Sequence, residues 1–96
     1  MTMKYVYKDQ PYTLTLDTNN SLAGASELKI LYRKPEGTTG ELAGSDTGTS
    51  IQASVPGATN DTEGVWSFQT SAIFNGDTNA TLGDLFLLRV KPAWSK

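Results

Sequence analysis

The chain has 96 residues with 8 Lys and Arg against 10 Asp and Glu, so its formal net charge is −2, and it contains neither His nor Cys. These counts exclude a disulfide, a cysteine nucleophile, a histidine general base and a zinc site built on His and Cys. The length predicts one domain over residues 1–96, in which 91–96 form a C-terminal tail.

Charge and hydropathy also limit the expected partners. The net charge is negative and the basic residues are scattered, whereas a nucleic-acid-binding surface needs clustered positive charge. No apolar run approaches the ~18 residues of a membrane-spanning helix, and residues 1–5 lack the apolar segment of a secretion signal. We therefore expect no nucleic-acid partner, no membrane partner and no export by a signal peptide.

Apolar residues alternate with polar ones along most of the chain, which is the period of half-buried strands. In chain order the pattern covers residues 5–7, 12–16, 26–34, 51–55, 66–74 and 86–90. Turn-forming Gly, Asn, Asp and Pro residues separate these segments. We expect little helix beyond a single turn at 82–84, and a poorly ordered loop or hairpin at 40–48. The pattern predicts an all-β antiparallel sandwich of about seven strands.

The apolar face of each predicted strand defines the expected core, with Trp66 as its central aromatic residue. The predicted core residues are Leu14, Leu16, Leu28, Ile30, Tyr32, Ile51, Val55, Trp66, Phe68, Phe86, Leu88 and Val90.

Few patterns suggest chemistry. Ser26 and Lys29 match a Ser-x-x-Lys motif, but on a strand these two positions point to opposite faces. Asn75, Asp77 and Asn79 have the spacing of a calcium loop, yet the glycine and the final glutamate of that loop are absent. A looser calcium site built from several loops stays open. The acidic residues lie mostly in turns, so we expect no enzyme, no catalytic residue and no cofactor.

Three aromatic residues are candidates for an interface. Tyr5 and Tyr7 flank Val6 on the first predicted strand, where they either contact a partner or cap the core at an edge. Trp94 follows the last predicted strand, and it either folds over the end of the sandwich or anchors a neighbouring subunit.

Residues 61–68, Asp-Thr-Glu-Gly-Val-Trp-Ser-Phe, resemble the corner between strands E and F of immunoglobulin-like domains, Asp-x-Gly-x-Tyr-x-Cys. Thr62, Trp66 and Phe68 replace the Asp, Tyr and Cys of that pattern. The resemblance therefore implies an immunoglobulin-like sandwich that lacks the usual disulfide.

The order of motifs over roughly residues 5–91 is also similar to that of small tailed-phage virion proteins, including the N-terminal domain of baseplate upper proteins. The motifs are the alternating strand at 12–17, Leu-Ala-Gly-Ala at 22–25, Tyr-Arg-Lys-Pro-Glu-Gly at 32–37 and Gly-Val-Trp-Ser-Phe at 64–68.

This second resemblance implies a non-enzymatic structural protein of a phage or prophage particle, placed in the tail, the baseplate or the capsid exterior. Such a protein assembles in the host bacterial cytoplasm and contacts other virion proteins and copies of itself, as a homo-oligomer in a symmetric assembly. The alternative is a carbohydrate- or host-surface-binding module, in which exposed aromatic residues stack on sugars.

Overall fold

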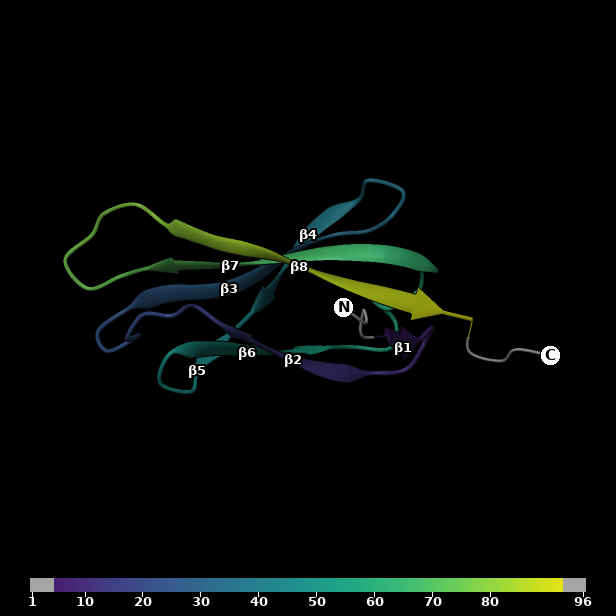
Figure 1. Ribbon diagram of the computed structural model, residues 1–96, viewed down its shortest axis with the longest axis horizontal. Helices are drawn as coiled ribbons and strands as arrows, with labels where there is room; N and C mark the ends of the chain where they lie inside the picture. Colours follow the sequence, from purple (N-terminus) through teal and green to yellow (C-terminus); the bar gives the residue numbers. More distant parts are fainter. Residues whose placement is uncertain (1–4, 93–96) are drawn as a thin grey trace.

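The computed structural model describes residues 5–92, and this range contains eight strands and no helix. The strands are β1 (Tyr5–Tyr7), β2 (Tyr12–Asp17), β3 (Ser26–Arg33), β4 (Thr39–Ala43), β5 (Ser45–Asp46), β6 (Ser50–Val55), β7 (Gly64–Ile73) and β8 (Thr81–Lys91). They form a five-stranded sheet, β1-β8-β7-β3-β4, and a three-stranded sheet, β2-β6-β5. The two sheets lie one over the other, with the three-stranded sheet along the lower side of Figure 1.

The strand order is that of an immunoglobulin-like sandwich, in which strands B, E and D belong to one sheet and G, F and C to the other. Here β2-β6-β5 take the places of B, E and D, and β8-β7-β3 take those of G, F and C. The edge strand β4 corresponds to the extra strand of variable-type domains. The predicted all-β, immunoglobulin-like sandwich without a disulfide is confirmed, with eight strands in residues 5–92 where about seven were expected.

One strand pair departs from the expected antiparallel arrangement. β1 pairs with β8 in the parallel sense, with Tyr5 opposite Arg89 and Tyr7 opposite Lys91. The chain passes from one sheet to the other between β1 and β2, so β1 adds to the edge of the five-stranded sheet beside β8. The first and last strands of the described range are therefore neighbours.

The core lies between the sheets and takes the alternate apolar residues of both. Among the residues predicted for the core, those that are buried are Leu14, Leu16, Ile30, Ile51, Val55, Trp66, Phe68, Leu88 and Val90. Leu28, Tyr32 and Phe86 are only partly buried and pack against this cluster. Leu28 lies beside an irregularity in β3, where Glu27 has a φ of 56° and the register with β7 shifts between Ser26 and Lys29.

The sequence-based prediction was wrong for two segments. Residues 40–48 are not a poorly ordered loop, because they contain most of β4 and all of β5, and Leu42 enters the core. Gly40 lies opposite Tyr32, and a side chain at position 40 would collide with the Tyr32 ring, so the glycine reflects close packing inside a strand. Residues 82–84 belong to β8, where a register irregularity replaces the expected turn.

Trp66 lies near the start of β7, just after the corner that leads into this strand. Its indole Nε1 donates a hydrogen bond of 2.8 Å to the carbonyl oxygen of Thr62, four residues upstream, and its ring is fully buried. The ring stacks on Phe68 with centroids 6.0 Å apart and lies 5.6 Å from the ring of Tyr32. In immunoglobulin-like domains a tyrosine at this corner bonds back to the backbone in the same way.

We expect Trp66→Ala to lower the free energy of unfolding by about 3–5 kcal/mol, because it leaves a large cavity in the core. Trp66→Phe keeps most of the ring and loses the hydrogen bond, so its cost is about 1 kcal/mol beyond any repacking. Urea unfolding followed by circular dichroism measures both. Equal costs for the two variants would contradict the central packing role of the indole.

Candidate functional site

The five-stranded sheet has a face directed away from the three-stranded sheet, which we call the outer face. The register places alternate residues of each strand there, and one row across the sheet runs from Glu41 through Leu31 and Gln69 to Leu85. Along each strand, the residues that alternate with the outward ones point into the core, such as Phe68 in β7 and Leu88 in β8. The same alternation that builds the core therefore determines which side chains face outward.

The large hydrophobic residues that are exposed within residues 5–92 all lie on two adjacent strands of the outer face. Their exposed fractions are Tyr5 50%, Tyr7 45%, Leu82 53%, Leu85 65% and Leu87 44%. Register places Tyr5 and Tyr7 beside Arg89 and Lys91 of β8, on the side that also carries Leu85 and Leu87. Leu82 lies opposite Ser71, which pairs with Lys29 of the same face. We call these five residues the β1–β8 stripe.

The two tyrosines of the stripe pack on each other instead of capping the core. Their rings meet edge to face with centroids 5.8 Å apart. The Lys91 ammonium lies 4.0 Å from the centre of the Tyr5 ring, which is a cation–π contact. The structure thus brings Tyr5 and Tyr7 together on an exposed edge, while the third interface candidate, Trp94, lies outside the described residues.

The leucines of the stripe were not among the residues predicted for a site. The signal for two of them, Leu85 and Leu87, is the run at 85–88, Leu-Phe-Leu-Leu, which carries apolar residues at outward as well as inward positions. A strand buried on one face alternates apolar with polar residues, so a strand that is apolar on both faces indicates a second contact.

Asn60 positions β1, and with it the two tyrosines. Its fully buried side chain donates hydrogen bonds from Nδ2 to the carbonyl oxygens of Tyr7, at 2.7 Å, and Gln10, at 2.9 Å. The main-chain carbonyl oxygen of Asn60 accepts a hydrogen bond from the amide of Asp9 at 2.7 Å. These bonds tie the end of β1 and the following turn to the segment before β7. Sequence reasoning gave Asn60 no role.

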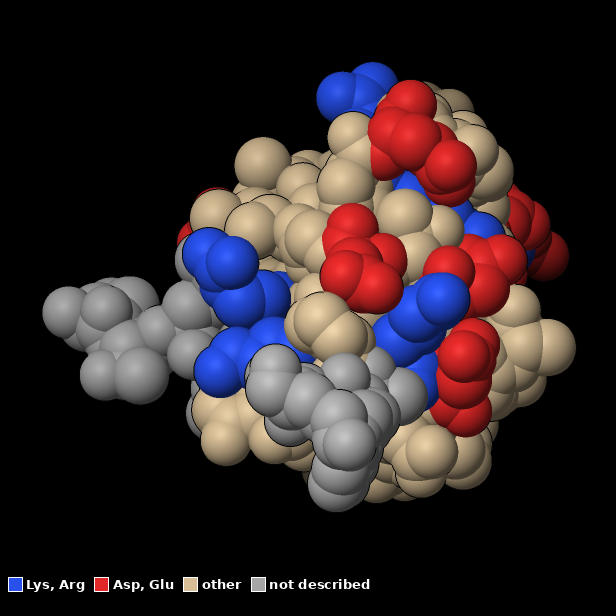
Figure 2. Space-filling view, turned by 90° about the vertical axis from the view of Figure 1, so that its right-hand side faces the viewer, with Lys and Arg blue, Asp and Glu red and all other residues tan. Residues whose placement is uncertain are grey.

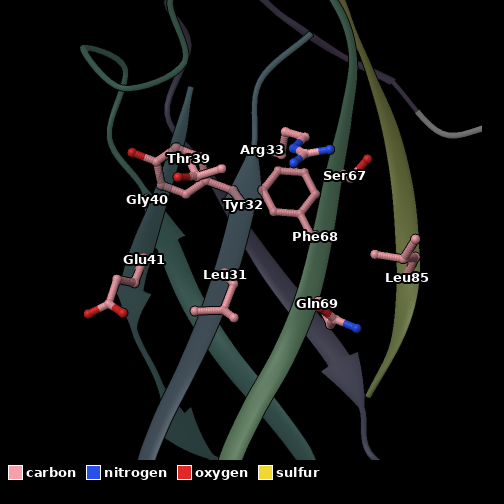
Figure 3. Close-up of a pocket in the computed structure, with 10 residues that line it drawn as sticks. All are labelled: Leu31, Tyr32, Arg33, Thr39, Gly40, Glu41, Ser67, Phe68, Gln69 and Leu85. Atoms are coloured by element: carbon pink, nitrogen blue, oxygen red, sulfur yellow. The ribbon is translucent and has the colours of Figure 1, made fainter. Parts of the chain in front are cut away.

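A hollow of about 530 Å³ lies on the outer face beside the stripe. Figure 3 shows that its side chains come from neighbouring strands, with Leu31 between Glu41 on one side and Gln69 on the other. The lining residues are Leu31, Tyr32, Arg33, Thr39, Gly40, Glu41, Ser67, Phe68, Gln69 and Leu85. Leu85 belongs to both the hollow and the stripe, so the two features form one continuous surface.

Charges surround this surface without forming one patch of a single sign. Lys29 bridges to Glu41, with Nζ 3.3 Å from Oε1, and lies 3.8 Å from Oε2 of Glu27. At the end of the sandwich where β8 ends, basic and acidic side chains are interspersed (Figure 2).

A second ion pair holds the corner around Trp66. Lys34 Nζ lies 2.7 Å from Oδ1 of Asp61 and 5.4 Å from the centre of the Trp66 ring. The hydrogen bond to Asp61 raises the pKa of Lys34. The hydrogen bond from Lys34, followed by that from Thr62, lowers the pKa of Asp61 below its ordinary value of 3.8.

The structure does not bring together the residues of the Ser-x-x-Lys match or of the calcium-loop spacing into a site within residues 5–92. Lys29 is engaged by Glu41, and Ser26 lies at the opposite side of the β3 irregularity. In the loop at 75–79, the Asp77 amide donates to the Phe74 carbonyl oxygen. The described part of the chain contains no group of three His, Cys, Asp or Glu side chains that could hold a metal ion. It also contains no helix long and apolar enough to cross a membrane.

Comparison with known proteins finds no family model, no curated protein and no solved structure that matches the chain significantly.

Asn60→Ala tests the role of Asn60 in positioning β1. The change removes the side-chain donor to the carbonyls of Tyr7 and Gln10, and the Tyr7 carbonyl keeps only the longer bond of 3.3 Å from the Gln10 amide. We therefore expect a loss of about 2–3 kcal/mol in unfolding free energy. Hydrogen exchange in β1 should become faster, because that strand loses its tether. Asn79→Ala, at an exposed loop position, is the control and should change stability by less than about 0.5 kcal/mol. Unchanged exchange in β1 would contradict the assignment.

Asp61→Asn tests the corner ion pair through pH. A carboxyl whose pKa is lowered by folding stabilises the native state above its ordinary pKa, and loses that contribution as the pH falls through the lowered value. The urea midpoint of the natural chain should therefore exceed that of Asp61→Asn near neutral pH. The difference should disappear as the pH falls below 3.8 and through the lowered pKa. Asp84→Asn is the control, because Asp84 forms no ion pair within residues 5–92. Its urea midpoint should stay close to that of the natural chain over the same pH range.

Proposed function

We propose that this chain is a non-enzymatic structural protein of a phage or prophage particle, in the tail, the baseplate or the capsid exterior. It acts through protein–protein contacts with other virion proteins and with copies of itself in a symmetric assembly.

The β1–β8 stripe is the observation that carries the proposal. Single exposed apolar residues are ordinary on protein surfaces, but neighbouring ones on a rigid sheet mark an interaction site. The stripe places three leucines and two tyrosines on adjacent strands, and Tyr is enriched in protein interfaces. Arg89 and Lys91 lie beside the tyrosines and supply a polar rim. An apolar centre with a charged border is the usual anatomy of a protein interface.

The resemblance of the motif order to small tailed-phage virion proteins supports placing this interface in a phage particle. The motifs at 32–37 and 64–68 occupy β3 with its following turn and the start of β7. These segments form the centre of the five-stranded sheet, whose outer face carries the interface.

Two contacts favour protein binding over the alternative of sugar binding. Stacking on a sugar needs an exposed aromatic face, yet Trp66 is fully buried. One face of Tyr5 is already in contact with Lys91, and Tyr7 presses its ring against that of Tyr5. The leucines of the stripe offer apolar area without hydrogen-bonding groups, which suits a protein partner.

Quantitative mass spectrometry of purified particles tests the proposal. The natural chain should be present at a fixed number of copies per particle. Leu85→Glu/Leu87→Glu should enter particles at least about tenfold less, because charges in the centre of an interface oppose its desolvation. Both leucines are exposed, so the variant should keep the fold, and its thermal unfolding should match that of the natural chain.

Ala23→Glu/Ala58→Glu is the matched control, since it adds the same two charges at exposed loop positions away from the outer face. This variant should enter particles as the natural chain does. Absence of the natural chain from particles would overturn the proposal, and equal incorporation of the Leu85 and Leu87 variant would remove the stripe from the interface.

A further inference from the structure

The edge strands of the two sheets differ in how well they are protected against pairing with another chain. An edge strand exposes unpaired backbone amides and carbonyls, and proteins usually protect it by short length, charge, proline or a bulge. In the five-stranded sheet, β1 has only three residues, and β4 carries Glu41 and Gly40. In the three-stranded sheet, β5 has only two residues, one of them acidic.

β2 has none of these protections between Tyr12 and Leu16. It is six residues long and pairs with β6 over its whole length without a register shift. Its sequence, Tyr-Thr-Leu-Thr-Leu-Asp, contains no proline, glycine or lysine, and its one charge, Asp17, is at the end. No strand of the described range lies on the side of β2 away from β6. β2 is therefore a regular edge strand, and its outer backbone groups pair with no other strand of residues 5–92.

We propose that β2 pairs antiparallel with β2 of a second copy of this chain, joining two three-stranded sheets into one six-stranded sheet across a two-fold axis. The inference rests on the proposed assembly function and names one contact by which copies of the chain associate. Addition of a strand to an open edge is a common mode of recognition, and pairing of one surface with itself gives a two-fold dimer.

The side chains of β2 are compatible with pairing to itself in one particular register. With the two-fold axis at Leu14, each Thr13 lies opposite Thr15 of the other copy, and Tyr12 lies opposite Leu16. All inward residues then stay inward, because a shift by one residue would turn Leu14 and Leu16 to solvent. The outward threonines form cross-strand pairs, which stabilise sheets.

Charge also favours a second copy as the occupant. In this register Asp17 lies opposite Pro11, so the two Asp17 carboxylates are at opposite ends of the joined strands and no like charges meet. A second copy therefore supplies a strand of the same length, with matching alternation of apolar and polar residues and with no like charge opposite Asp17. A strand from a different virion protein would need to match these features separately.

Sedimentation equilibrium of the purified full chain, from about 10 to about 500 µM, tests this pairing. We expect a reversible monomer–dimer equilibrium. Thr13→Lys/Thr15→Lys places Lys opposite Lys twice and should weaken the dimer about tenfold or more. Thr13→Glu/Thr15→Lys places Glu opposite Lys twice and should keep the dimer. Both sites are exposed on the monomer, so both variants should fold.

Thr39→Lys/Ala43→Lys adds the same positive charge on β4 and should leave the dimer unchanged. A natural chain that stays monomeric, a dimer that survives Lys opposite Lys, or a dimer lost equally in both β2 variants would overturn the proposal. If a variant fails to fold, hydrogen exchange of the natural chain tests the pairing instead. The amides of residues 12–17 must then exchange more slowly as the concentration rises, while those of residues 39–43 do not change. A monomeric chain that is nevertheless found in particles would refute this pairing and leave the proposed function standing.

Discussion

The fold depends on the burial of Trp66 near the start of β7. The indole N–H of Trp66 donates its hydrogen bond to the Thr62 carbonyl oxygen, and the ring packs between those of Tyr32 and Phe68. The Lys34 ammonium lies over the Trp66 ring and forms an ion pair with Asp61. These contacts link β3 to the start of β7, the central strand of the five-stranded sheet. In the usual immunoglobulin domain a disulfide assists this packing, whereas here aromatic stacking and one ion pair do so.

The position of Trp66 also determines what lies on the outer face. Once Trp66 and Phe68 point inward, the pleat directs Ser67 and Gln69 outward, and pairing with β8 then turns Leu85 and Leu87 outward as well. Because β1 runs parallel to β8 with Val6 inward, its two tyrosines join the same side. The core and the β1–β8 stripe are thus two consequences of one register, and a shift by one residue that disrupted the core would also disperse the stripe.

The alternation of apolar residues was sufficient to predict the fold class, the main strands and most of the core. It failed at Gly40, because a glycine-rich composition indicates a loop unless the neighbour that needs the space, Tyr32, is known. It also failed to assign a role to Asn60, whose partners lie about 50 residues away in the sequence. Tyr5 and Tyr7 were candidates because they flank Val6 on a predicted strand. The run at 85–88 shows that apolar residues face outward, but only the register between β1 and β8 places Leu85 and Leu87 on the same face as the two tyrosines.

The parallel pairing of β1 with β8 has a mechanical consequence. Force applied to the chain through the beginning of β1 and the end of β8 acts in opposite directions along two parallel neighbours. Their hydrogen bonds cross the line of pulling, so they are loaded in shear and share the force. The bonds from Asn60 to the turn after β1 add to this resistance. An antiparallel terminal pair would open one bond after another, whereas the hydrogen bonds of this pair must break together.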